Sequence, residues 1–197
     1  MSRALPLLLA ALLMASATPA WPFSNGIAGQ TCTGSNCHNP QPLPITALCL
    51  EGLPDDAQYD PAKRYRLRIT VHGINVRLDV GDPGAALAGF SLRAKTGTFF
   101  TIDRTTTLWN RSVVSHSAEG NRRTEWEVDW QPSLTAASET FTLAGNAVNG
   151  NRGNDDGDLW NRATFAASAS PSPSATPGSF CTDPALPAPV YVPEPAH

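Results

Sequence analysis

Hydrophobic and polar residues alternate over short runs, and this pattern predicts β-strands along most of the chain. In residues 64–71 every second side chain is aromatic or aliphatic, and three of the side chains between them are arginine. In residues 124–130 Trp126, Val128 and Trp130 alternate with acidic residues. A period of two with aromatic and β-branched residues on one face is typical of a half-buried strand. We therefore expect both tryptophans in a core and the arginines on a solvated face.

Further runs of this kind recur along the chain, and turn-rich stretches separate them. The strands are expected at 45–50, 64–71, 89–94, 98–103, 113–116, 124–130, 140–144 and 160–165. With 18 prolines and 15 glycines, the chain has few stretches that favour a helix. Short strands at regular spacing indicate an all-β fold, an antiparallel β-sandwich of the immunoglobulin-like kind.

The first twenty residues predict a secretory signal peptide. Arg3 precedes an apolar run over 5–14, and small residues follow that run. The run is too short to span a membrane, and no second run of spanning length follows. The mature protein is therefore expected to be exported, to the periplasm or the extracellular space, where thiols oxidise.

The composition divides the rest of the chain into three parts. Residues 21–44 are irregular, and residues 45–167 contain the predicted strands of one domain. Residues 168–197 are rich in serine and proline and predict a linker with an extended tail, without a sorting sequence. The formal net charge is -3 and no basic patch is present, so we expect neither a nucleic-acid partner nor a membrane span.

One motif in the irregular segment suggests a cofactor. Cys32 and Cys37 are separated by four residues, and His38 follows directly. Two cysteines followed by a histidine are how c-type haem is attached: the thiols bond the haem vinyl groups and the histidine binds the iron. The common spacing has two residues between the cysteines. The alternative is a small Cys32–Cys37 disulfide loop with His38 as a bystander.

The other two cysteines, Cys49 and Cys181, lie far apart in the sequence. If the first pair holds haem, the second pair can close a disulfide, which would stabilise the domain by roughly 2–4 kcal/mol. A protein with two disulfides and no cofactor would pair its cysteines in the same way. The number of cysteines alone does not separate the two interpretations.

Several landmarks together resemble the bacterial choice-of-anchor V domain, which is similar to the animal reeler domain. They are, in order, the motif segment 26–38, Gly52-Leu53-Pro54 with Tyr59-Asp60-Pro61, the segments 89–94 and 97–99, Ser115-His116-Ser117, Trp130-Gln131-Pro132 and the Asn/Gly-rich segment 141–158. The resemblance spans about residues 24–166 and implies a reeler-like β-sandwich. Two features differ: the family commonly has C-x-x-C-H, and its C-terminal sorting sequences are not visible here.

The resemblance also suggests a second axial ligand for the iron. His116 lies at the family's histidine position, at the end of a predicted strand, whereas His72 is followed by glycine and His197 ends the tail. Both methionines fall in the signal peptide, so a His/Met centre is excluded. With His38 and His116 as ligands the iron would have no open site, and such a centre transfers electrons. The alternative for each histidine is a structural or surface imidazole.

A second metal site is suggested by the Asn/Asp-rich segment 149–158. Asn151, Asp155, Asp156 and Asp158 offer the oxygen ligands that Ca²⁺ prefers, although the spacing is not that of an EF-hand. The alternative is a long turn in which Asn and Gly adopt positive φ and Asp side chains cap backbone amides.

Two functional hypotheses follow. The first is an exported monohaem c-type cytochrome-like protein for electron transfer or redox sensing, with a redox partner that the sequence does not identify. The second is a secreted, non-catalytic reeler-like binding or adhesion module with two disulfides, no haem and a cell-surface or matrix partner. Neither a G-x-S-x-G elbow nor an HExxH helix is present, and we do not expect an enzyme.

Overall fold

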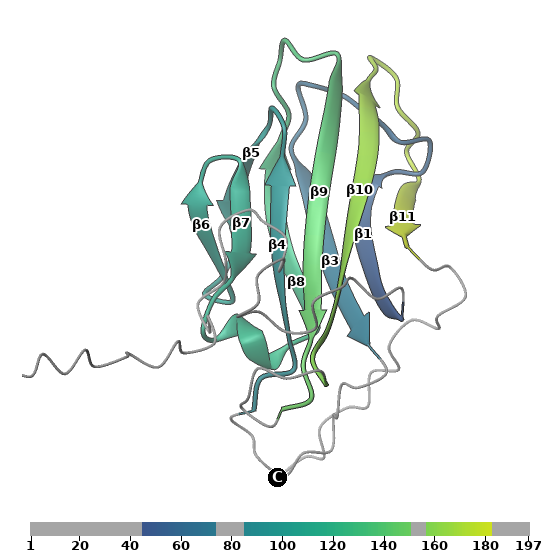
Figure 1. The fold of residues 1–197 in the computed structure, drawn as a ribbon. Coiled ribbons are helices and arrows are strands. Elements are labelled where there is room, and N and C mark those ends of the chain that lie inside the picture. Colours follow the sequence, from purple (N-terminus) through teal and green to yellow (C-terminus); the bar gives the residue numbers. More distant parts are fainter. Residues whose placement is uncertain (1–44, 74–84, 151–156, 183–197) are drawn as a thin grey trace, which may run out of the picture.

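The structure is a computed structural model, and it describes residues 45–73, 85–150 and 157–182. These residues form two β-sheets that pack face to face, with a single short 3₁₀ turn, Gly120–Arg122, in the described part (Figure 1). The predicted all-β sandwich is confirmed. None of the described residues belongs to a helix long and apolar enough to cross a membrane.

The first sheet has five described strands in the order β11-β1-β3-β8-β5, and each neighbouring pair is antiparallel. Its strands are β1 (Thr46–Pro54), β3 (Tyr65–Gly73), β5 (Thr98–Thr101), β8 (Glu125–Gln131) and β11 (Pro177–Cys181). The period-two runs predicted over 64–71 and 124–130 are β3 and β8, which lie side by side at the centre of this sheet.

The second sheet has six described strands in the order β2-β10-β9-β4-β7-β6. Its strands are β2 (Gln58–Tyr59), β4 (Ala88–Ala94), β6 (Thr106–Asn110), β7 (Val113–His116), β9 (Ser138–Ala147) and β10 (Leu159–Ala169). The short β2 pairs in parallel with β10, and the other described pairs are antiparallel. In Figure 1, β6 and β7 lie at one side of the sandwich and β11 lies at the other.

The core lies between the sheets and contains both predicted tryptophans. Trp126 and Trp130 are 2% and 0% exposed. The ring of Trp130 meets Tyr59 and Phe141 edge-on, at centroid distances of 5.2 and 4.8 Å. Aromatic rings packed in this orientation add to the stabilisation that comes from burying their area. The alternation read in β8 therefore identified the residues at the centre of the core.

The C-terminal part of the domain differs from the sequence-based boundary at residue 167. β10 continues to Ala169, and β11 pairs with β1 inside the segment predicted to be a linker and tail. Backbone bonds fasten the chain on both sides of β11: before it, the amide of Asp55 donates to the Thr176 carbonyl, and after it, the amide of Thr182 donates to the Leu48 carbonyl. Composition did not reveal this strand because its pairing is made by backbone groups, which every residue type except proline offers in full.

Candidate functional site

The residues predicted to attach haem, Cys32, Cys37 and His38, lie outside the described residues. Their role stays a prediction. His72 and His116 are described, and they lie on different sheets: His72 is on β3 opposite Ala47, and His116 ends β7. Within residues 45–73, 85–150 and 157–182, no three His, Cys, Asp or Glu side chains lie close enough to hold a metal ion.

His116 is buried, with 8% of its surface exposed, and it fills the end of the contact between β4 and β7. Its Nδ1 accepts a hydrogen bond from the Phe90 amide at 3.0 Å and lies 3.1 Å from the Phe90 carbonyl oxygen. Its ring lies against Gly89, where an added Cβ would be only 2.5 Å from the ring carbon Cε1. Coordination of iron through Nε2 would require the proton on Nδ1, which would then donate to the Phe90 carbonyl.

The predicted calcium ligands are mostly outside the described residues, since Asn151, Asp155 and Asp156 are not among them. Asp158 is described, is 1% exposed, and accepts a hydrogen bond from the Asn149 amide at 3.1 Å. This bond is the capping contact expected of the alternative, a long turn. The calcium site stays a prediction.

The predicted disulfide between Cys49 and Cys181 is present. The two residues are direct partners in the pairing of β1 with β11, with a Cα–Cα distance of 4.1 Å. The bond therefore fastens the edge strand β11 to the domain, and it joins positions 132 residues apart.

The solvated face of the five-stranded sheet consists of paired charges. Arg66 donates to Asp129 at 2.7 Å and lies 3.6 Å from Glu127, and Arg68 lies 3.6 Å from Glu127 and 3.9 Å from Glu51. The hydrogen bond to Asp129 is the main reason why the pKa of Arg66 is raised above its ordinary value. The arginines are exposed, as predicted, but the acidic residues of β8 neutralise this face, so it is not a free anion-binding surface.

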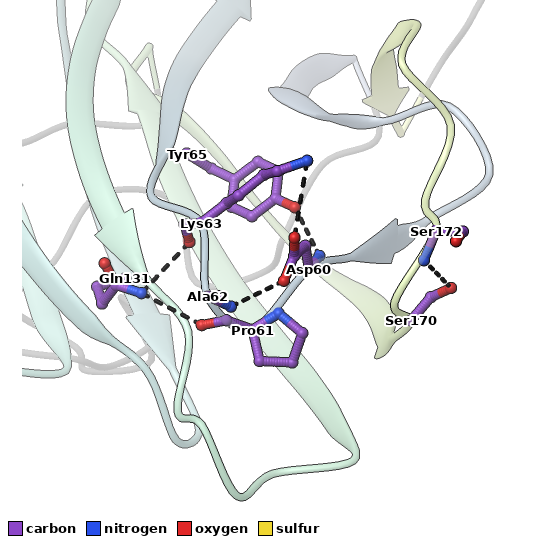
Figure 2. A network of polar contacts seen from close by, with 8 residues as sticks. All are labelled: Asp60, Pro61, Ala62, Lys63, Tyr65, Gln131, Ser170 and Ser172. Carbon is purple, nitrogen blue, oxygen red and sulfur yellow. Dashed lines mark hydrogen bonds and ion pairs between the residues drawn. The ribbon is translucent and has the colours of Figure 1, made fainter.

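The turn between β2 and β3 holds a polar network that Figure 2 shows from close by. The amide of Asp60 donates to the Tyr65 hydroxyl at 2.6 Å, and the Asp60 carboxylate accepts from the Ala62 amide at 2.9 Å. The Gln131 side chain, at the end of β8, donates to the carbonyls of Pro61 and Lys63, each at 3.3 Å. These groups bond to one another and fix the turn, so the network is structural.

A buried carboxylate holds the turn between β4 and β5. Glu139 is 1% exposed, and its oxygens accept hydrogen bonds from the amides of Lys95, Thr96, Gly97 and Thr140 and from the Thr96 hydroxyl. Several donors around one carboxylate compensate for its loss of water. Its charge also contributes to the raised pKa of Tyr59, of which burial is the larger cause.

Four exposed apolar side chains lie on β5, on the loop after it and on β6, and β5 and β6 are in contact. Phe100 on β5, Ile102 in the following loop, and Leu108 and Trp109 on β6 are 37%, 40%, 41% and 48% exposed. We call these four residues the β5–β6 edge. The Arg64 guanidinium lies over the Phe100 ring, 4.1 Å from its centroid. The residue pattern does not predict this surface, because alternation does not distinguish an edge strand from a central one.

Comparison with solved structures finds similarity to reeler domains. The Reelin-N domain of F-spondin is 20% identical, with 69% of this chain and 94% of that chain covered and a TM-score of 0.43. Two crystal structures of the human F-spondin reeler domain are 16% and 20% identical and cover 72% and 71% of this chain and 100% of theirs, with TM-scores of 0.45 and 0.42.

No protein-family model and no curated protein matches the chain. The resemblance to the choice-of-anchor V domain therefore stays a prediction. Because the structural similarities are also low, the function has to be inferred from the side chains of this chain.

Proposed function

We propose that the protein is an exported, non-catalytic binding module that holds a partner on the surface of the cell that secretes it, or in its matrix, through the β5–β6 edge. The observation that carries this proposal is that two neighbouring elements, β5 with its following loop and β6, expose four large apolar side chains: Phe100, Ile102, Leu108 and Trp109. Single exposed apolar residues are ordinary on protein surfaces, whereas a cluster of them is typical of a binding surface.

The chemistry of the edge also suits binding. Tryptophan, phenylalanine and arginine are enriched where proteins meet, and Trp109 and Arg64 are of these types. The guanidinium of Arg64 covers one face of Phe100 and stays exposed to solvent. A partner can therefore contact an aromatic ring and a cation together.

The buried polar groups that the structure describes support a role without catalysis. The Glu139 carboxylate bonds the β4–β5 turn, and the His116 ring bonds the backbone of Phe90. Each of these groups is buried and is bonded to the backbone around it. They are accordingly assigned to the stability of the fold.

The double variant F100S/W109S tests the binding edge. We expect the fraction of protein retained on the secreting cells to fall about tenfold, since large aromatic side chains at an interface commonly contribute more than 1 kcal/mol each. Immunoblots of washed cells and of the medium measure this fraction. The control is L134S, because Leu134 is the most exposed of the described large apolar residues, at 75%, and lies in the loop between β8 and β9.

L134S should unfold at the same urea concentration as the wild type, since Leu134 is 75% exposed. F100S/W109S should unfold at a somewhat lower urea concentration, because Phe100 and Trp109 are each about half buried, and it should be fully folded without urea. Retention that is equal for the wild type, F100S/W109S and L134S would contradict the proposal. So would a wild-type protein that is found entirely in the medium.

We propose separately that haem is bound covalently to Cys32 and Cys37, with His38 as the first ligand and His116 as the second; the motif supports the first three residues and the family resemblance supports His116. If it is right, the purified protein absorbs in the Soret region after acid–acetone extraction, and Cys37→Ser abolishes this absorption. The intact mass should exceed that of the chain by one haem. Peptide mapping that finds a native Cys32–Cys37 disulfide would exclude haem and leave the binding module.

A further inference from the structure

We propose that the partner segment bound at the β5–β6 edge is an extended, acidic stretch of another protein, which adds as a strand to β6. This inference rests on the proposed function and adds the chemistry and the geometry of the partner. It follows from the position of β6 in its sheet, from the unpaired charges at both ends of the strand, and from the poor fit of β6 to a second copy of itself.

The open side of β6 is the first observation. Among the described strands β6 pairs with β7 alone and ends the six-stranded sheet. Alternate residues of such a strand direct their amide and carbonyl groups away from the sheet, where an extended peptide can bond to them. The pairing shifts register between Leu108 and Asn110, which places Trp109 at an irregularity. Bulges of this kind change the direction of a side chain, and Trp109 is 48% exposed.

The charge of the edge is the second observation. Arg104 precedes β6 and Arg111 follows it, both are exposed, and neither forms an ion pair in the part of the chain that the structure describes. The one acidic neighbour, Asp103, accepts hydrogen bonds from the amide and hydroxyl of Thr105 at 2.8 and 2.6 Å. Arg66 and Arg68 on the solvated face of the five-stranded sheet, by contrast, are paired with glutamate and aspartate. Cations that lack a partner at both ends of an apolar strand select an acidic ligand.

Pairing of two β6 strands is the obvious alternative, and the same two arginines oppose it. In an antiparallel pair of two β6 strands, the end of one strand that carries Arg104 lies beside the end of the other that carries Arg111, so the pairing brings like charges together. Like charges directly opposite each other destabilise a strand pair, and charged residues at an edge commonly prevent self-association. An acidic segment turns both of these repulsions into attractions.

The experiment uses a fluorescein-labelled octapeptide with two glutamates at each end and alternating valine and threonine between them. A second peptide has lysine in place of glutamate, and a third is the glutamate peptide with alternate backbone amides N-methylated. Fluorescence anisotropy with the full chain should show binding of the glutamate peptide about tenfold tighter than binding of the lysine peptide. R104E/R111E should reverse this preference, while L134S should leave it unchanged.

Each other outcome overturns the inference. An unchanged preference in R104E/R111E would show that the arginines do not select the ligand, and equal binding of the N-methylated peptide would exclude strand addition. A wild-type dimer in sedimentation velocity that W109S dissociates would identify a second copy as the occupant. If F100S/W109S loses retention on cells but neither peptide binds the wild type, the proposed function stands and this inference falls.

Discussion

Replacement of both cysteines in C49S/C181S is expected to lower the free energy of unfolding by about 4 kcal/mol. The disulfide closes a loop of 132 residues, and in the chain-entropy account a loop of this length lies at the upper end of what a crosslink contributes. Both residues are replaced so that no odd thiol remains. Urea unfolding followed by tryptophan fluorescence measures the change, because Trp126 and Trp130 lie in the core.

The loss of stability in C49S/C181S should be concentrated at β11, the edge strand of the five-stranded sheet. β11 pairs with β1 alone among the described strands, so without the disulfide only its backbone bonds and the partly buried Phe180 hold it. We expect amide exchange of β11 to accelerate, while β9 at the centre of the other sheet stays protected. S172A, at an exposed position in the segment before β11, is the matched control and should change neither measurement. An unchanged urea midpoint in C49S/C181S would contradict the prediction.

The regular part of the fold could be predicted from the sequence because the signal is local. In β3 and β8 one face is buried and the other is wet, so a period of two appears in the residue types themselves. The position of Trp126 and Trp130 in the core followed from the same pattern. Such strands need no information about the rest of the chain.

The edges could not be predicted in this way because they are defined by neighbours distant in the sequence. β11 lies in a serine- and proline-rich stretch and is held by β1, more than 100 residues earlier. β6 offers only Leu108 and Trp109 as apolar residues, and both are exposed. The run Thr-Thr-Leu-Trp-Asn contains residues that favour strands but does not alternate between apolar and polar positions, and only its pairing with β7 shows that it is a strand.

The residues of the candidate site likewise include some that the sequence could indicate and others that it could not. The cysteine–histidine motif could be noticed because its meaning depends on spacing alone. His116 lies at the end of a strand, as predicted. Its hydrogen bond with the Phe90 amide could not be predicted from residue types. Glu139 was missed because the donors that surround it come mainly from a turn more than 40 residues earlier.

Replacement of Glu139 by alanine is expected to lower the free energy of unfolding by about 3 kcal/mol. The change removes the carboxylate that accepts from the Thr96, Gly97 and Thr140 amides and from the Thr96 hydroxyl, in a site where Glu139 itself is 1% exposed. The Lys95 amide keeps its bond to the Thr140 carbonyl. Glutamine keeps one oxygen but turns an NH₂ group toward amide donors, so E139Q should lose about half as much. The control is E127Q, whose exposed ion pairs with Arg66 and Arg68 should contribute less than about 1 kcal/mol.

The part of the structure that loses stability when Glu139 is replaced distinguishes this carboxylate from an ordinary buried side chain. If Glu139 holds the turn, amide exchange in E139Q should accelerate first at Thr96 and Gly97, whose amides donate to it, before the core of β9 opens. A side chain that only fills space would instead weaken the contact between β9 and its neighbours. An E139A variant as stable in urea as E127Q would contradict the prediction, because the turn would then be held by its own backbone, and the buried charge would contribute nothing that the fold requires.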